Sequence, residues 1–268
     1  ETAKLLGGGN SDDCNCLKAI DKTYSIVPME GYDAPEYRND DASSPEIDLP
    51  FTFCLYGTNY SSCYINNNGN VSFGSPYSTF SSSGFPNASF VMVAPFWADV
   101  DTRPAESGLP WYKITDHYMI VIWDHVGYYS QQTDKLNTFQ LIISDGTDPI
   151  IPNGNNVSFC YGDMEWTTGS ASGGQNGFAG TPATVDVNEG DGVSFMQAGR
   201  FDHAGTDYDG PTGAFDGVSW LDNQIMPINS CDATSGNLIP IAPVLTLCDT
   251  LYVCAGNDID LQFLGPEV

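Results

Sequence analysis

The chain has 268 residues, of which 41% are hydrophobic and only 16% are charged, and it contains 28 glycines and 17 prolines. This length is sufficient for one large domain with a buried core, and the many glycines and prolines exclude long helices, so we expect a nearly all-β protein. Eight Lys and Arg against 34 Asp and Glu give a formal net charge of −26, which repels nucleic acids and anionic membranes, so neither is an expected partner.

Residues 1–50 are acidic and rich in prolines, with only short apolar pieces such as Tyr24–Val27. We expect this part to be a loop-rich N-terminal segment that packs on the core. Its first ten residues lack the apolar region of a signal peptide, and no window of the chain is apolar enough to span a bilayer. We therefore expect no transmembrane segment and an export signal that has already been removed.

Strand patterns begin at Phe51. An Asn-Gly pair at Asn68–Gly69 predicts a β-hairpin, because both residues tolerate the positive φ of a tight turn. The run Tyr118–Val126 is mostly apolar, with four β-branched residues and no glycine or proline, which indicates a strand buried on both faces. Strand spacing of this kind favours a β-sandwich-like fold with long loops. The expected strands are residues 51–56, 63–65, 71–73, 90–94, 111–115, 118–126, 138–144, 157–166 and 193–196.

The amino-acid composition of the C-terminal third changes several times along the chain. Residues 167–192 are rich in glycine, and residues 200–217 are rich in Asp and poor in core residues. Apolar residues return at 220–231, and we expect them to close the main domain at 51–231. Residues 232–268 then predict a linker and the first strands of a second, immunoglobulin-like β module. An incomplete module predicts that the chain is part of a longer parent protein.

The eight cysteines indicate an oxidising compartment, because none lies in a Cys-x-x-Cys pair and the three histidines are scattered. Cys54 and Cys63 flank a segment able to fold back on itself, so we predict a disulfide between them. Sequence alone leaves the pairing of the other cysteines open.

Two groups of aspartates are candidate calcium ligands. Asp99 and Asp101 follow large apolar residues, and their alternate spacing sends both carboxylates to one side of an extended strand. A bound cation, a network with Arg103 or simple solvation would each account for such a pair. The second group is Asp207, Asp209 and Asp216, in which the first two Asp and a following glycine resemble the start of a calcium loop. That segment lacks the closing Glu and the flanking helices of an EF-hand.

Motifs of catalysis are largely missing. The sequence has no Gly-x-Ser-x-Gly, no His-Glu-x-x-His and no glycine-rich phosphate loop. Asp163 and Glu165, which precede Trp166, are a carboxylate pair of the kind glycosidases use, but a solvated strand face explains them as well. We therefore expect no catalytic residues, with a polysaccharide hydrolase as an alternative.

Several separated segments together resemble the NIDO domain, the extracellular module of nidogen, of alpha-tectorin and of large bacterial surface proteins. They are Tyr64–Phe73, Val93–Arg103, Trp111–Tyr112, Asn137–Leu141 and Tyr161–Trp166, and they occur in the family's order between about residues 51 and 203. The part after Gly199 is similar to the region that comes after this domain in large secreted proteins of the Bacteroidetes type.

This resemblance implies a secreted or cell-surface, non-enzymatic module of adhesion or structure. Its partners would be other surface or matrix proteins or glycans. An alternative is the N-terminal part of a secreted surface filament or gliding-type adhesin, with a role in secretion or assembly.

Overall fold

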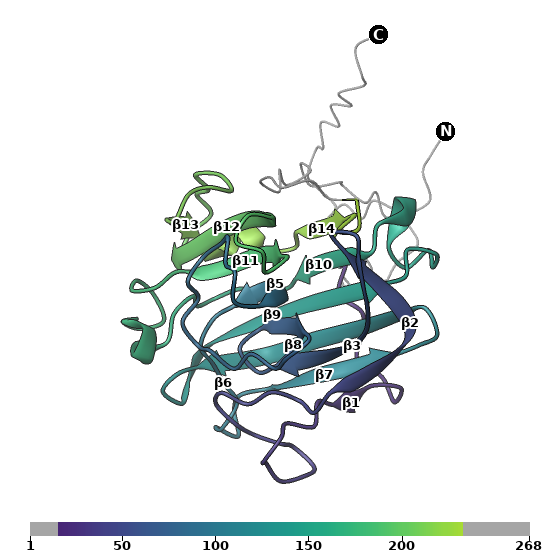
Figure 1. Ribbon diagram of the computed structural model, residues 1–268. Helices are drawn as coiled ribbons and strands as arrows, with labels where there is room; N and C mark the ends of the chain where they lie inside the picture. The colour runs from purple at the N-terminus through teal and green to yellow at the C-terminus, as the bar shows by residue number, and fades with distance from the viewer. Residues whose placement is uncertain (1–15, 233–268) are drawn as a thin grey trace, which may run out of the picture.

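The computed structural model describes residues 16–232, which form two seven-stranded β-sheets packed as a sandwich (Figure 1). The first sheet has the order β1-β7-β8-β9-β10-β14, with β6 beside β8, and the second has the order β13-β12-β11-β5-β4-β3-β2. The predicted all-β sandwich is confirmed, and among the described residues helical structure is limited to three short 3-10 turns.

The first sheet consists of β1 (Ser25–Ile26), β6 (Val100–Asp101), β7 (Leu109–Ile114), β8 (Tyr118–Tyr128), β9 (Gln132–Ser144), β10 (Val157–Tyr161) and β14 (Ile225–Ile228). The second consists of β2 (Ile47–Leu55), β3 (Thr58–Asn66), β4 (Asn70–Phe73), β5 (Val91–Trp97), β11 (Ala183–Asn188), β12 (Phe195–His203) and β13 (Asp216–Gly217). The 3-10 turns are η2 (Pro152–Gly154), η3 (Ser170–Ser172) and η4 (Val218–Leu221).

Aromatic side chains fill the space between the sheets. Phe139 of β9 stacks on Trp123 of β8 with ring centroids 5.1 Å apart, and it also contacts Phe96 of the opposite sheet at 5.5 Å. Trp166 lies edge-on to Phe96 at 5.8 Å. These rings are fully buried and join the two layers into one core.

Strand β8 is buried on both faces over most of its length, as its apolar run predicts. Met119, Val121 and Trp123 point into the core between the sheets. Ile120 and Ile122 point to the other face, where they pack with Tyr24, Ile142 and Ile151. The residues that cover this outer face include part of the N-terminal segment, which also supplies β1 and the first residues of β2.

The Asn-Gly hairpin is confirmed between β3 and β4. Gly69 has φ of 76°, and a Cβ at this position would collide with the carbonyl oxygen of Phe96. Phe96 in turn donates its backbone N–H to the Gly69 carbonyl at 3.3 Å. Glycine is therefore required here both by the turn and by the close approach of β5.

The sequence did not reveal β11, which lies in the middle of the second sheet between β5 and β12. Its outward positions carry Thr184, Asp186 and Asn188 rather than apolar residues, and all three are buried. They alternate with Ala183, Val185 and Val187, which face the core, and this strand signal is obscured by the glycine-rich sequence around it. The predicted second β module at residues 239–268 lies outside the described residues.

Candidate functional site

An asparagine-rich turn between β3 and β4 organises the candidate site. The Asn68 side chain accepts the Val100 N–H on Oδ1 (2.9 Å) and donates from Nδ2 to Oδ1 of Asp41 (2.8 Å). The Nδ2 of the buried Asn67 donates to the carbonyl oxygens of Asp40 and Val100. The turn therefore fixes the loop that carries Asp40 and Asp41 against the segment between β5 and β6.

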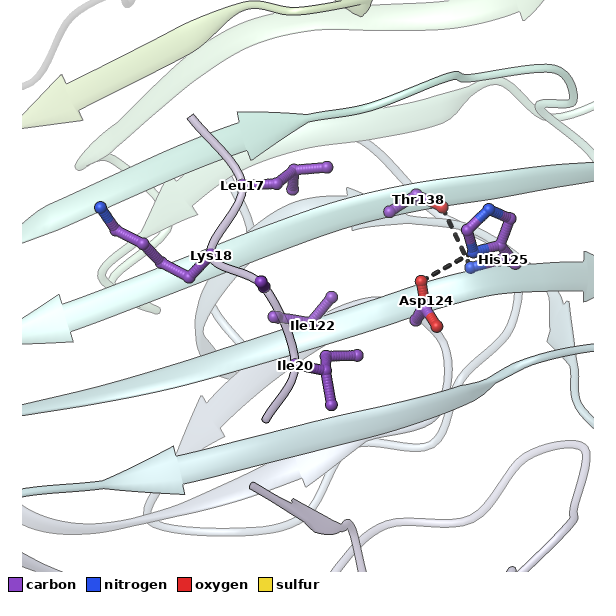
Figure 2. A pocket seen from close by; sticks show the side chains of 8 residues that line it. Leu17, Lys18, Ile20, Ile122, Asp124, His125 and Thr138 are labelled. Atoms are coloured by element: carbon purple, nitrogen blue, oxygen red, sulfur yellow. Dashed lines mark hydrogen bonds and ion pairs between the residues drawn. The ribbon is translucent and has the colours of Figure 1, made fainter. Parts of the chain in front are cut away.

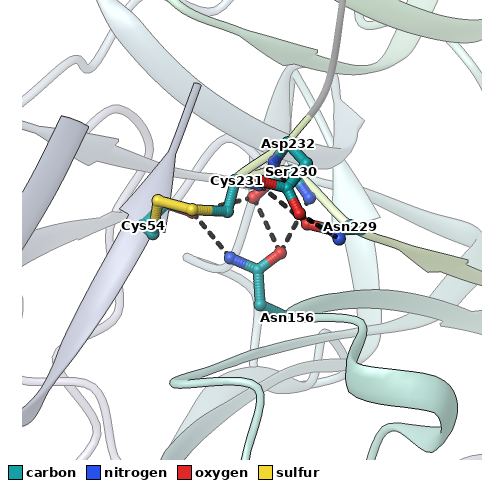
Figure 3. Close-up of a disulfide and its surroundings, with 6 residues drawn as sticks. All are labelled: Cys54, Asn156, Asn229, Ser230, Cys231 and Asp232. Carbon is teal, nitrogen blue, oxygen red and sulfur yellow. Dashed lines mark hydrogen bonds between the residues drawn. A yellow bond between two sulfur atoms is a disulfide. The ribbon is translucent and has the colours of Figure 1, made fainter. Parts of the chain in front are cut away.

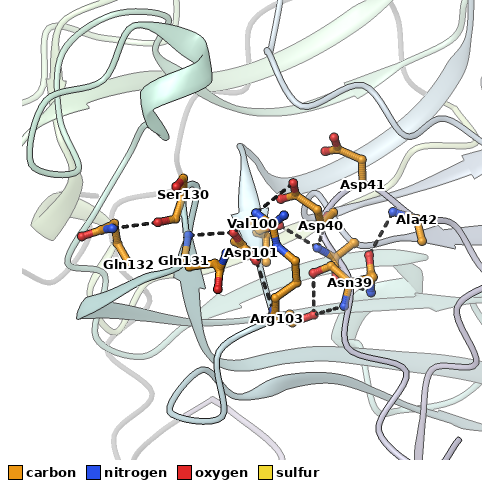
Figure 4. Close-up of polar contacts among 12 residues, drawn as sticks. Asn39, Asp40, Asp41, Ala42, Val100, Asp101, Arg103, Ser130, Gln131 and Gln132 are labelled. Carbon is orange, nitrogen blue, oxygen red and sulfur yellow. Dashed lines mark hydrogen bonds and ion pairs between the residues drawn. The ribbon is translucent and has the colours of Figure 1, made fainter. Parts of the chain in front are cut away.

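Three carboxylates meet at this junction, and we call Asp40, Asp41 and Asp99 the acidic cluster. One oxygen from each lies within 4.8 Å of the others, and among residues 16–232 no other three potential metal-ligand side chains meet this way. Asp99 is only 2% exposed. Its Oδ2 and the Oδ1 of Asp40 are buried without a hydrogen-bond donor. Figure 4 shows Asp40 beside Arg103 and the side chain of Asp41 farther from it.

The environment of the acidic cluster disfavours negative charge. Burial raises the pKa of Asp99 to about 8, and the charges of Asp41, Asp40 and Asp101 act in the same direction. Burial also raises the pKa of Asp40 to about 6, with Asp101 and Asp41 adding to the effect and Arg103 opposing it. Charged carboxylates at this position therefore need a partner that supplies positive charge.

Asp101 differs from Asp99 in having a full set of donors. Its side chain is fully buried, and its Oδ1 accepts from the backbone N–H (3.1 Å) and the Nε (2.8 Å) of Arg103. Its Oδ2 accepts from the Arg103 guanidinium and from the Gln131 N–H (2.8 Å). Arg103 also reaches Oδ2 of Asp40 at 3.1 Å and lies over the Tyr129 ring. Three explanations were open for the pair of Asp99 and Asp101: a bound cation, a network with Arg103 or solvation. The network with Arg103 accounts for Asp101.

The second predicted calcium group is arranged differently. The Asp207 side chain is 69% exposed and pairs with His203 at 2.9 Å. Asp216 is buried, and its two oxygens accept the backbone N–H groups of Asp209 (2.8 Å) and Arg200 (3.0 Å). Burial raises the pKa of Asp216 to about 7. These bonds hold the loop together as an Asp-rich turn, and calcium binding by Asp207, Asp209 and Asp216 stays a prediction.

The carboxylate pair Asp163 and Glu165 lines a surface hollow of about 350 Å³ together with His125. Oε2 of Glu165 accepts the Leu136 N–H at 2.7 Å. An adjoining hollow of about 380 Å³ is bordered by His125 and by residues 17–20. As Figure 2 shows, His125 there bonds Asp124 through Nδ1 at 2.7 Å. The geometry thus brings Asp163, Glu165 and His125 to one surface region.

A third hollow of about 240 Å³ lies beside the acidic cluster and is mostly polar. Its lining includes Tyr129 and Ser130 from the turn between β8 and β9, Gln132 at the start of β9, and Ser170 and Asn176 from the loop around η3. The Tyr129 ring is partly exposed there. An aromatic ring among amide and hydroxyl groups is an arrangement suited to sugar contacts.

The predicted disulfide between Cys54 and Cys63 is wrong. Cys54 is bonded to Cys231, and a second disulfide joins Cys16 to Cys160. Cys63 is the one free cysteine of the described residues, and it is buried. In the β2–β3 hairpin Cys54 faces Asn59 and Cys63 faces Ile47, so the two cysteines lie in different parts of the ladder. Cys14, Cys248 and Cys254 lie outside the described residues.

The Cys54–Cys231 bridge is reinforced by a polar network (Figure 3). Asn156 donates from Nδ2 to the Cys54 carbonyl at 2.6 Å and accepts the Ser230 N–H at 2.8 Å. The Ser230 hydroxyl also donates to the Cys54 carbonyl at 3.1 Å. The end of β2, the start of β10 and the end of β14 are therefore linked covalently and by hydrogen bonds.

Sequence reasoning missed Asp40 and Asp41. The sequence places them in the loop-rich N-terminal segment, where two adjacent acids followed by Ala42 and two serines are typical of a polar loop. Their proximity to Asp99 depends on the fold, because Asn68 holds the two segments together.

Several animal proteins are related to this chain. Alpha-tectorin of Gallus gallus is 32% identical over 200 residues, which is 64% of this chain and 9% of that protein, and alpha-tectorin of Homo sapiens is 33% identical over the same shares. Nidogen of Drosophila melanogaster is 26% identical over 156 residues, 48% of this chain and 11% of the nidogen. The chain thus spans about a tenth of the length of these relatives. No solved structure matches it.

The disulfides and the related proteins together indicate where the protein is located. Disulfides are stable in oxidising compartments, and the chain has two of them within residues 16–232. Its relatives are secreted proteins of the extracellular matrix, so the chain is extracellular. Within the described part, no helix has the length and apolar character needed to cross a membrane. A family model described as NIDO related matches residues 17–204, well over half of the sequence, and the chain therefore belongs to the NIDO-related family.

Proposed function

We propose that this chain is a non-enzymatic structural or adhesion module of a much larger surface protein, acting through contacts with other proteins or glycans. The observation that carries the proposal is the family match over residues 17–204, with relatives of which the aligned region is only 9% to 11%. A domain that occupies so small a part of a long extracellular protein serves as one unit among many.

The surface chemistry supports contacts with cationic partners. A net charge of −26 attracts basic surfaces over a distance set by the ionic strength, and this attraction weakens as salt is added. The hollow beside Tyr129 supports a separate contact with a glycan, in which the exposed ring stacks on a sugar and nearby Gln132 and Asn176 accept or donate hydrogen bonds.

Binding measurements test this proposal. The purified 268-residue chain is applied to a glycan array and to immobilised matrix proteins at two salt concentrations. We expect a reproducible ligand, and for a glycan ligand we expect Tyr129→Ala to lower the signal while Tyr32→Ala, an exposed tyrosine elsewhere, does not. Turnover of a polysaccharide that is abolished by Asp163→Asn or Glu165→Gln in a folded protein would contradict the non-enzymatic assignment.

The alternative of a bacterial surface filament or gliding-type adhesin depends on the sequence after Gly199. It predicts that the chain co-purifies with secretion or assembly proteins of its source cell. Purification of the tagged parent protein from that cell distinguishes this role from simple adhesion.

A further inference from the structure

We propose that the acidic cluster is a calcium site, with one carboxylate oxygen each from Asp40, Asp41 and Asp99 as protein ligands. This assignment replaces the predicted pair of Asp99 and Asp101 by a site that draws on two separate segments of the chain. It is independent of which protein or glycan the module contacts.

The first support is the unsatisfied buried oxygen of Asp99. Asp99 is only 2% exposed, and its Oδ2 accepts no hydrogen bond. A buried carboxylate without donors is costly unless a cation or a proton neutralises it. Oδ1 of Asp40 is also buried without a hydrogen-bond donor, so two of the three members of the acidic cluster have an oxygen available for a ligand.

The second support is the local excess of negative charge. Asp40, Asp41, Asp99 and Asp101 gather around one cation, Arg103. Arg103 is largely committed to Asp101, whose two oxygens it occupies, and it reaches only Oδ2 of Asp40. When all four acids are ionised, three negative charges remain after this pairing, and a divalent ion would remove most of them.

Ligand type favours calcium, and the spacing of the oxygens is compatible with it. Oxygens on one calcium ion at about 2.3–2.6 Å can be up to about 5 Å apart, whereas oxygens on magnesium at about 2.0–2.1 Å are at most about 4.2 Å apart. The cluster oxygens lie within 4.8 Å of one another, a span that calcium accommodates, and a set of three protein carboxylates is more typical of calcium than of magnesium. Asp40 and Asp41 are partly exposed, so water has access to complete the coordination.

Calcium at this position would order the loops around the Tyr129 hollow. The carbonyl oxygen of Asp99 accepts the Tyr129 N–H at 3.1 Å, and the Tyr129 carbonyl in turn accepts the Ser170 N–H at 3.0 Å. Gly169 is packed so closely on the Asp99 carboxylate that a Cβ there would overlap it. Movement of Asp99 is therefore transmitted to both loops that line this hollow.

Calorimetry of the full 268-residue protein tests the site. After removal of metal with a chelator, calcium chloride is titrated into the wild type and into Asp99→Asn, and thermal unfolding is followed with and without calcium. We expect one site with a dissociation constant of about 10⁻⁴–10⁻³ M, typical of extracellular modules, and a higher melting temperature with calcium. Asp99→Asn should weaken binding about tenfold or more, because a ligand charge is lost.

Asp209→Asn is the matched control, since Asp209 belongs to the other predicted calcium group. It should bind calcium like the wild type. Circular dichroism verifies that Asp99→Asn is folded. If it is not, Asp41→Asn, a change at a partly exposed position, should weaken calcium binding in the same way. Wild-type melting that is indifferent to calcium, or calcium binding that survives Asp99→Asn, would overturn the proposal. Binding lost in Asp209→Asn alone would move the site to the Asp207–Asp216 loop.

Discussion

Removal of the Cys54–Cys231 disulfide tests the assignment that replaces the predicted Cys54–Cys63 pair. This bridge ties the end of β2 to the residues after β14 across a sequence separation of 177 residues. The perturbation is the double change Cys54→Ala and Cys231→Ala, so that no unpaired thiol remains at either position. The network of Asn156 and Ser230 is left in place.

The size of the effect follows from the loop that the bridge closes. The loss of loop-closure entropy predicts about 5 kcal/mol for a loop of 177 residues at 25 °C. The Cys16–Cys160 bridge offers a shorter covalent path between the same ends, but the dependence on loop length is logarithmic, so the estimate falls only slightly. In a domain of this size such a loss corresponds to a melting temperature lower by about 10–20 °C.

Urea unfolding and calorimetry under non-reducing conditions measure this loss. The matched control is Cys63→Ala, which removes a buried thiol but no cross-link and should cost only about 1 kcal/mol. Peptide mapping of the intact protein should recover a linked peptide containing Cys54 and Cys231. A peptide that joins Cys54 to Cys63, or equal destabilisation by the double change and by Cys63→Ala, would refute the reasoning.

Three further changes probe the fold. Gly69→Ala should cost about 3 kcal/mol or more in urea unfolding, because it combines a left-handed φ with a collision at Phe96, whereas Gly57→Ala, with φ of 80° and open space around it, should cost about 1–2 kcal/mol. Arg103→Met should cost about 2–4 kcal/mol by leaving the buried Asp101 without its partner, and adding Asp101→Asn should recover part of this; no recovery would count against the pairing. Burial raises the pKa of Asp186 well above its usual value, so the native state holds a proton that the unfolded state releases. Stability should therefore fall as the pH rises above about 4, by up to about 1.4 kcal/mol per pH unit, and Asp186→Asn should flatten this slope in urea titrations at several pH values.

Short sequence patterns correctly predicted a turn and a strand whose structure depends mainly on neighbouring residues. The Asn68–Gly69 turn needs a positive φ and has it at Gly69, and the apolar run of β8 is buried on both faces. Strand β11 was missed although Ala183, Val185 and Val187 alternate with polar residues, because glycine-rich sequence surrounds this short run. Its outward side chains are polar and are nevertheless buried, with Asn188 donating to the Asn87 and Phe90 carbonyl oxygens of the segment that covers it. The burial of these polar positions comes from the covering segment and cannot be inferred from the alternation of the strand itself.

The disulfide pairing also could not be predicted from neighbouring residues alone. Cys54 and Cys63 are close in sequence, but the tight turn at Tyr56–Gly57 sets a register in which they are not opposite each other. Cys63 instead points into the core, where burial raises the pKa of its thiol to about 12. The partner that Cys54 does find arrives with β14, and only the order of strands in the complete first sheet brings it there.

The same reasoning explains why Asp99 and Asp101 have different roles despite their alternate spacing. The rule that alternate residues share a face holds within a regular strand, but β5 ends at Trp97 and β6 begins at Val100. Asp99 therefore lies in the break between strands that belong to different sheets, and Asp101 lies in the second of them. Arg103 satisfies Asp101 locally, whereas the surroundings of Asp99 come from residues 40 and 41, delivered by the asparagine turn. A sequence motif can thus supply one member of a carboxylate cluster while the other members are contributed from elsewhere in the chain.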